Sequence, residues 1–322
     1  MKNLYRILVL FLFLSLCGIS RGTARSASAG ELWITNQSSN TLSIIDTETY
    51  QTLATIPSGG SEPHNITFSP DGKEAWVCHV GSNNVAVFDV SARKLLTLLP
   101  GGKRAHAVTF TPDGRYAYLA NPGSNDVWVF EAATKNLIKV IPVGEAPQLI
   151  TFSRDGKKAF VTNSKSEEVW VLDTTTYEVL AKIPAGRDVM GCGTTQDSRH
   201  LYVTAGGDNG VTLIDTLTYQ NVKFIETGLD THGLVISPDD RYVYVANRGE
   251  NTLSVIDSST NRVIQTIPVG KKPDILTISP DGHYVYVTNR LEDTISVVDT
   301  VSRQALKVIP VGKEPHGIAL KP

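Results

Sequence analysis

The 322-residue chain contains only three cysteines, and this scarcity excludes a small fold held together by disulfide bonds. Two of them, Cys78 and Cys192, lie far apart in the sequence, in non-adjacent copies of a repeat. We expect their Cα atoms to be farther apart than the ~7 Å that a disulfide tolerates. The sequence also has no closely spaced pair of cysteines that would predict a structural zinc site.

The sequence also lacks runs of basic residues and the motifs of common enzymes. Residues 1–29 contain four basic residues and no acidic one, so the rest of the chain has 26 basic and 32 acidic residues, a net charge of −6. Nucleic-acid-binding proteins use clustered Lys and Arg to displace counterions from phosphates, so we expect no nucleic acid partner. A Gly-rich phosphate loop, a nucleophile elbow and an EF-hand loop are all missing from the sequence.

Long apolar stretches are missing except at the start of the chain. Lys2 and Arg6 precede an apolar run over residues 7–14, which is short for a membrane span and typical of a secretory signal. Ala27-Ser28-Ala29 has the small residues of a cleavage site. The sequence therefore predicts a signal peptide over residues 1–29, and a mature protein that is periplasmic, secreted or on the cell surface.

Two alternatives to a cleaved signal peptide remain open. The first is a lipoprotein anchor at Cys17, although Leu16 stands where lipoprotein signals usually have a small residue. The second is an uncleaved membrane anchor. With the signal removed, we expect no transmembrane segment.

Four short phrases recur seven times along residues 30–322. In the last copies they are Val285–Asn289, Thr294–Thr300, Lys307–Gly312 and Pro315–Leu320. They are rich in β-branched and aromatic residues at strand length, and Asp-Gly pairs such as Asp281-Gly282 predict tight turns between them. The repeat period is 42 residues, and a fixed period of four short strands indicates a β-propeller.

The two ends of the repeat predict how the ring closes. The first copy lacks its innermost strand, and the last copy consists of an innermost strand only, residues 315–320. Pairing this strand with the three N-terminal strands over residues 31–58 completes a blade and leaves no open edge between first and last blades. We therefore predict an all-β fold: a single seven-bladed β-propeller of four-stranded blades over residues 30–322, closed by that pairing.

The phrases Val287-Thr288-Asn289, Ser254–Asp257 and Ile267–Gly270 resemble those of the YVTN-repeat β-propeller family. The resemblance covers essentially all of residues 30–322 and implies the seven-bladed architecture. Members of this family are mostly exported and include surface-layer proteins, periplasmic binding proteins and companions of redox enzymes. The resemblance implies no particular ligand, because function depends on the site and not on the fold.

One position of the repeat, which we call the slot, collects the residues able to carry chemistry. It precedes the apolar run of each innermost strand, so we expect it at the mouth of the central channel. The chain has seven histidines, and four of them lie in this slot. The occupants of the slot are His64, His106, Gln148, Met190, His232, Asp274 and His316. Ring closure places the four histidines and Asp274 in five consecutive blades.

Two interpretations of the slot residues remain open. Imidazole and carboxylate groups suit zinc or copper, so His64, His106, His232, Asp274 and His316 are predicted metal ligands. Alternatively, duplication has copied a turn histidine into several blades around a wide hub. A tight turn at Asp71-Gly72 would place His79 opposite His64, and a register off by one would place Cys78 there instead.

The leading functional hypothesis is a non-enzymatic, exported binding scaffold. Loops on one face of a rigid ring would bind a protein partner or small ligand at the channel mouth, with Gln148, Met190 and His79 on that surface. A metal-binding protein or metal-dependent enzyme is the alternative, and nucleic-acid binding is a third and less favoured hypothesis.

Overall fold

The computed structural model describes residues 30–322. The predicted signal peptide, its cleavage site and the alternative anchor at Cys17 lie outside the described residues. The part of the chain that is described contains no apolar helix of membrane-spanning length.

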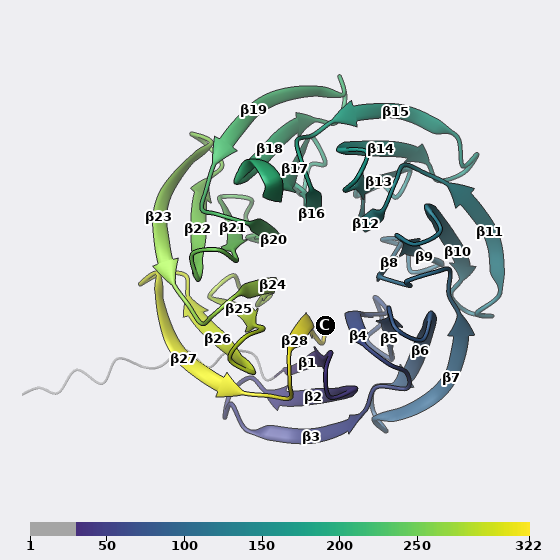
Figure 1. Cartoon of the computed structure of the whole chain (residues 1–322), viewed down its shortest axis with the longest axis vertical. Coiled ribbons are helices and arrows are strands. Elements are labelled where there is room, and N and C mark those ends of the chain that lie inside the picture. Colours follow the sequence, from purple (N-terminus) through teal and green to yellow (C-terminus); the bar gives the residue numbers. More distant parts are fainter. Residues whose placement is uncertain (1–29) are drawn as a thin grey trace, which may run out of the picture.

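Seven four-stranded antiparallel sheets stand around a central axis, as the blades of a propeller (Figure 1). From the innermost to the outermost strand, the first four sheets are β28 (Pro315–Leu320), β1 (Glu31–Asn36), β2 (Thr41–Asp46), β3 (Thr52–Pro57); β4 (Pro63–Phe68), β5 (Glu74–His79), β6 (Asn84–Asp89), β7 (Lys94–Pro100); β8 (Ala107–Phe110), β9 (Tyr116–Asn121), β10 (Asp126–Glu131), β11 (Leu137–Pro142); and β12 (Pro147–Phe152), β13 (Lys158–Asn163), β14 (Glu168–Asp173), β15 (Val179–Pro184). The other three are β16 (Val189–Thr194), β17 (His200–Ala205), β18 (Gly210–Asp215), β19 (Gln220–Glu226); β20 (Thr231–Ile236), β21 (Tyr242–Asn247), β22 (Thr252–Asp257), β23 (Arg262–Pro268); and β24 (Pro273–Ile278), β25 (Tyr284–Asn289), β26 (Thr294–Asp299), β27 (Gln304–Pro310). A 3-10 turn, η1 (Gly206–Asp208), joins β17 to β18.

The predicted closure of the ring is confirmed. Strand β28 pairs antiparallel with β1, with Leu32 opposite Leu320 and Ile34 opposite Ile318. The blade therefore joins the two ends of the described chain, and the propeller has no unpaired edge at that junction. Closure also brings the slot of β28 beside those of β4 and β24.

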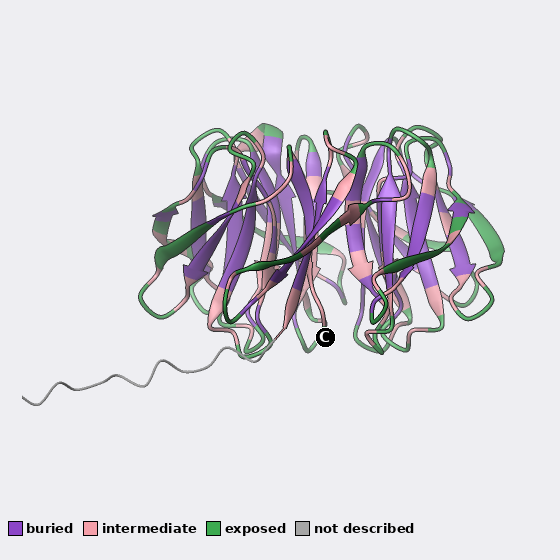
Figure 2. Ribbon diagram, turned by 90° about the horizontal axis from the view of Figure 1, so that it is seen from below, coloured by how far each residue is buried: buried purple, intermediate pink, exposed green. Residues whose placement is uncertain are grey.

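The core lies between adjacent blades and consists of large side chains that the repeat places at equivalent positions. The second and third strands of each blade are buried, whereas the outermost strands are mostly exposed (Figure 2). An aromatic ring on each of three second strands meets a phenylalanine on the next innermost strand edge to face. Trp33 contacts Phe68, Trp76 contacts Phe110, and Tyr118 contacts Phe152, with ring centroids 5.7, 5.2 and 5.0 Å apart.

The two cysteines of the described chain are free, as expected from their separation. Cys78 is buried in β5, and burial raises the pKa of its thiol. Burial likewise raises the pKa of Cys192, in β16, to about 12. Both therefore remain thiols at neutral pH.

The threonine of the Val-Thr-Asn phrase links neighbouring blades. In four blades its hydroxyl donates a hydrogen bond of 2.6–2.9 Å to the main-chain carbonyl of the slot residue in the next blade. These donors are Thr35, Thr162, Thr204 and Thr288, and the acceptors belong to His64, Met190, His232 and His316. The same hydroxyl accepts a hydrogen bond from its own innermost strand, as from Gly191 N to Thr204 Oγ1 at 2.7 Å. The repeated threonine thus holds the backbone of the slot.

We expect Thr204→Val to lower the free energy of unfolding by about 1–3 kcal/mol, because it leaves buried main-chain groups of Gly191 and His232 unpaired. Urea denaturation of the purified protein measures this effect. Thr204→Ser retains the hydroxyl and is expected to recover most of the loss. A valine variant as stable as the wild-type protein would contradict the proposed role.

Candidate functional site

A bulge in the innermost strand turns the slot residue toward the channel. In the blade of β4, residues 66–68 pair with β5 in one regular register, and the register then shifts between Ile66 and Pro63. Equivalent shifts occur in β12, β16, β20 and β24. Because a bulge adds a residue without a partner, two consecutive residues face the axis, such as His64 with Asn65.

The slot residues gather around a cavity of ≈10 Å³, which is about the space that one water molecule needs. Six of the seven slot residues line it: His64, His106, Gln148, Met190, His232 and His316. The cavity is therefore far smaller than an organic ligand.

Three of the histidines pack ring against ring across the channel mouth, with interplanar angles of 43° and 36°, and we call this group the stack. The ring of His64 lies between those of His106 and His316, at centroid distances of 4.0 and 3.5 Å. His106 Nδ1 lies 2.9 Å from the carbonyl oxygen of Gln148, and His316 Nδ1 lies 3.1 Å from that of His64. A carbonyl only accepts hydrogen bonds, so Nδ1 carries the hydrogen in both rings.

All three stacked imidazoles are held neutral. Burial lowers the pKa of His64 well below its usual value, and the neighbouring His106 and His316 lower it further. Burial also lowers the pKa of His106 to about 4 and that of His316 to about 3, although the Gln148 carbonyl and the Asp274 carboxylate respectively oppose these shifts. Near pH 7 the stack therefore contributes no positive charge.

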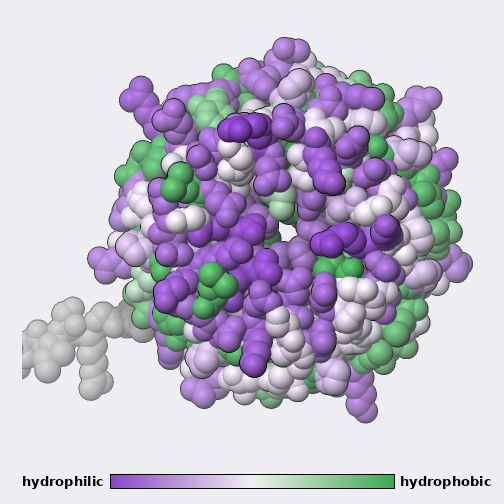
Figure 3. Space-filling model, viewed as in Figure 1, coloured by the Kyte–Doolittle hydropathy of each residue, from purple (hydrophilic) through white to green (hydrophobic). Residues whose placement is uncertain are grey.

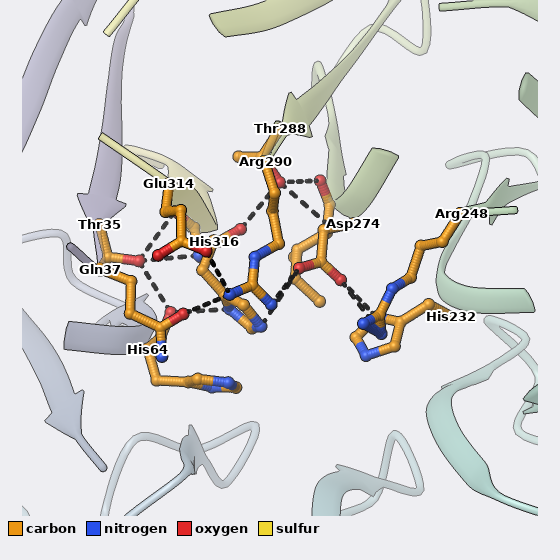
Figure 4. Close-up of polar contacts among 12 residues, drawn as sticks. Thr35, Gln37, His64, His232, Arg248, Asp274, Thr288, Arg290, Glu314 and His316 are labelled. Carbon is orange, nitrogen blue, oxygen red and sulfur yellow. Dashed lines mark hydrogen bonds and ion pairs between the residues drawn. The ribbon is translucent and has the colours of Figure 1, made fainter. Parts of the chain in front are cut away.

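Asp274 lies at the centre of the charged groups of the mouth, and its side chain is fully buried (Figure 4). Its Oδ1 lies 2.7 Å from His232 Nδ1, and its Oδ2 lies 3.4 Å from His316 Nε2. Burial alone would raise the pKa of Asp274, but its interactions with His232 and Arg248 outweigh burial and hold that pKa well below the usual range. The carboxylate is therefore a fixed negative charge beside the histidine stack.

Two arginines that were not predicted as site residues complete the charged cluster. Arg248 follows β21 and Arg290 follows β25, and their guanidinium groups lie 3.8 and 3.4 Å from the two oxygens of Asp274. Figure 4 shows both side chains directed toward this carboxylate. One residue directly follows the second strand of each blade. In two adjacent blades this residue is an arginine, and in the other blades it is not. A comparison of that position across the repeat, like that of the slot, would have found them.

His79 takes a different place from the one expected. It pairs with Pro63 and not with His64, because the bulge shifts the register by one residue beyond Ile66, which is the alternative register that the sequence left open. His79 does not line the cavity. It occupies the position held elsewhere by Asn36, Asn121, Asn163, Asn247 and Asn289. Its side chain is fully buried, and burial lowers its pKa to about 4, although nearby main-chain groups of Asn84, Ser58 and Val77 oppose this shift.

The predicted metal ligands come together at the channel mouth, and metal binding by them stays a prediction. Within residues 30–322, no group of three or more His, Cys, Asp or Glu side chains is arranged to hold a metal ion. Several of the ring nitrogens already have other partners. Nδ1 of His106 and of His316 contacts a main-chain carbonyl, and His232 Nδ1 lies against Asp274. The amide nitrogen of Gln148 likewise already donates hydrogen bonds to the carbonyl oxygen of Ala146 and to Ser164 Oγ.

The fold and the site define the protein as a seven-bladed β-propeller with polar and charged side chains at one mouth of its channel. The sequence matches the YNCE-like beta-propeller family over residues 21–198 and 188–321, and the chain belongs to that family. This result agrees with the YVTN-type propeller that the repeat predicted. A search of curated proteins found no significant match.

Solved structures share the fold at low sequence identity. Kuenenia stuttgartiensis hydrazine synthase has 19% identity and a TM-score of 0.77, over 88% of this chain and 99% of that one. The dihydro-heme d1 dehydrogenase NirN, in complex with DHE, has 16% identity and a TM-score of 0.69, over 90% and 74%. A protein of unknown function from Desulfotomaculum acetoxidans has 15% identity and a TM-score of 0.81, over 91% and 99%. At these identities the likeness concerns the fold alone.

Proposed function

We propose that this propeller is an exported, non-enzymatic binding scaffold that presents a protein- or small-ligand-binding surface at the mouth of its channel. The observation that carries the proposal is the convergence of four histidines, Asp274 and two arginines on that mouth. Hydrophilic side chains gather around the axis on the same face (Figure 3). Loops and strand ends on a rigid ring are well suited to present such a surface.

The opposite face offers larger clefts but less distinctive chemistry. Four clefts of ≈390, 580, 690 and 460 Å³ lie between blades, each beside the turns that join the innermost and second strands of two neighbours. Their recurrence from blade to blade follows from the repeat. The channel mouth, in contrast, gathers residues that differ between blades, and this difference favours it as the binding surface.

A capture experiment tests the proposal. The full chain is expressed in a bacterium, and partners are captured from the periplasm and the culture supernatant. We expect a partner or ligand that the double variant Gln148→Ala, Met190→Ala fails to retain. His200→Ala, at the start of β17 and on the opposite face, is the matched control and should retain it. Repeated failure to recover any partner, or equal recovery by both variants, would count against the proposal.

Export is a separate part of the proposal and rests on residues 1–29. We expect the protein in the periplasm, in the medium or on the cell surface, with an N-terminus at Gly30. Osmotic-shock fractionation and N-terminal sequencing measure both. A lipid-modified N-terminus at Cys17 would replace the cleaved signal peptide with the lipoprotein anchor, and an intact Met1 in the cytoplasm would refute export.

A transition-metal site is the second candidate function, and the Nδ1 contacts favour it. His106 and His316 use Nδ1 for main-chain carbonyls, and His232 Nδ1 lies against Asp274, an arrangement that commonly orients metal-binding histidines. His316 Nε2, however, lies 3.4 Å from Asp274 Oδ2, so a metal there would share this nitrogen's surroundings with the carboxylate. Zinc or copper would require His64 and its stacked neighbours to turn. Elemental analysis of untagged protein, before and after incubation with each metal, tests this. Uptake that His64→Ala abolishes would support the site, and protein that takes up neither metal would refute it.

A further inference from the structure

The buried charges of the channel mouth do not balance. The side chains of Arg248 and Arg290 are only 16% and 17% exposed, and that of Asp274 is fully buried. Two guanidinium cations thus share one buried carboxylate, at 3.8 and 3.4 Å. A cation removed from water needs a compensating partner, so the buried part of the cluster has one positive charge in excess.

The outer carboxylates compensate this excess only weakly. Arg248 Nε lies 3.6 Å from Asp230 Oδ2, and Arg290 Nη2 lies 3.6 Å from Glu314 Oε1. The side chains of Asp230 and Glu314 are 51% and 41% exposed. Pairs of this length with solvated carboxylates contribute little free energy, so a competing anion displaces them at small cost.

Both arginines also retain unused donors. The Nε atoms of Arg248 and Arg290 are buried and have no hydrogen-bond partner, although Arg290 Nη2 donates to Gln37 Oε1 at 2.6 Å. Guanidinium donors form a rigid fork that matches the oxygens of carboxylate and phosphate groups. The oxygens of Asp274, at 3.8 and 3.4 Å from these guanidinium groups, form no hydrogen bond with them either. The two Nε donors are therefore available to an acceptor that a ligand brings.

The other groups at the mouth agree with an anionic ligand. His64, His106 and His316 are neutral near pH 7, so they neither supply the positive charge nor repel the arginines. Arg248 and Arg290 occupy equivalent positions in adjacent blades, and Asp274 lies between them (Figure 4). Asp274 thus acts as a positioning residue that holds the two guanidinium groups side by side.

We propose that Arg248 and Arg290 form a recognition site for an oxyanionic group, a carboxylate or a phosphate, of a ligand that approaches the channel mouth. The ligand displaces Glu314 and Asp230 from the two guanidinium groups and leaves Asp274 in place. This inference rests on the proposed binding function and names the chemistry of the ligand.

Titration of the full-length protein with sodium phosphate and with sodium acetate, at constant ionic strength, tests the inference by calorimetry. We expect at least one of these anions to bind. Glu314→Gln and Asp230→Asn each remove an internal competitor, and each should raise the affinity by about two- to fivefold, the factor that corresponds to an exposed ion pair. Tighter binding of phosphate would assign a phosphate group, and tighter binding of acetate a carboxylate.

Substitutions of the arginines are expected to lower the affinity for the anion. Arg290→Gln is expected to weaken anion binding by at least about tenfold, the usual effect of losing a charge-assisted hydrogen bond. Arg290→Lys keeps the charge that neutralises Asp274 but loses the fork, so it tests the geometry even if the glutamine variant does not fold. Arg303→Gln is the matched control, because Arg303 lies over the Tyr242 ring on the opposite face.

Two results would overturn the inference. The first is the absence of binding of both anions to the wild-type protein and to Glu314→Gln. The second is binding that Arg290→Lys and Arg290→Gln leave unchanged. Neither result bears on the capture experiment. If a captured partner still depends on the channel mouth, the proposed function stands even though this inference fails.

Discussion

Replacement of Asp274 by alanine is expected to lower the free energy of unfolding by about 3–5 kcal/mol, the range for breaking a buried ion pair. The substitution removes the one buried negative charge beside Arg248 and Arg290 and leaves two largely buried cations without a buried partner. It also removes the contact of Asp274 with His232 Nδ1 at 2.7 Å. Urea denaturation, read from the midpoint and the slope of the transition, measures the loss.

Asp230→Asn is the matched control for that substitution. Asp230 contacts the same arginine from the outside, but its side chain is 51% exposed. We expect it to change the free energy of unfolding by less than about 1 kcal/mol, as solvated ion pairs usually do. If Asp274→Ala is no more destabilising than Asp230→Asn, Asp274 does not organise the channel mouth.

The protein is also expected to lose stability steeply as the pH falls from about 6.5 to about 4. An unfolded histidine binds a proton below about pH 6.5. His79, in contrast, is held neutral in the fold by burial, down to a pKa of about 4. Unfolding therefore takes up a proton in this window, so stability is complete above about pH 6.5 and decreases below it. For His79 alone the loss is about 3 kcal/mol.

The histidine stack adds to this acid sensitivity in the same direction. Burial lowers the pKa of His64, His106 and His316 as well. Urea denaturation at a series of pH values is expected to show little pH dependence above about pH 7 and, between about pH 6 and 4.5, a slope that exceeds about 1.4 kcal/mol per pH unit, the value for one proton. A slope near zero in this range would show that the buried histidines do not remain neutral in the fold.

His79→Asn separates the contribution of His79 from that of the stack. Asparagine occupies the equivalent position in five other blades, where Asn121 Oδ1, for example, accepts a hydrogen bond from Gly102 N at 3.1 Å. The substitution should reduce the proton uptake by one and leave stability at pH 7.5 unchanged or higher. His200→Asn makes the same substitution at a partly exposed position on the opposite face and is the comparison variant.

The fold was predictable in detail because its causes are local and repeated. Strand-length phrases such as Tyr242–Asn247, the Asp-Gly turns and the 42-residue period each follow from short stretches of sequence. Ring closure followed from the same repeat, since an incomplete first copy and a lone final strand fit together. The regular register of the hairpin at Asp71-Gly72 also agreed with the structure over Ile66–Phe68.

The chemistry of the channel mouth was predictable only in part. The slot was found because one position of a known period can be compared across blades, and six of its residues do line one cavity. The bulge that turns the slot residue toward the axis has no sequence signal of its own, so the sequence could not decide whether His79 or Cys78 lies opposite His64. The arginines escaped notice because they belong to a different position of the repeat.

The sequence by itself therefore determined the number of blades, the strand order and the ring of slot residues, because periodicity and turn chemistry are properties of neighbouring residues. Only the tertiary structure decided that three histidines stack, that His79 lies outside the cavity, and that Arg248 and Arg290 converge on Asp274. These contacts join side chains from separate blades. Their geometry depends on the bulge of each innermost strand and on the closure of the whole ring.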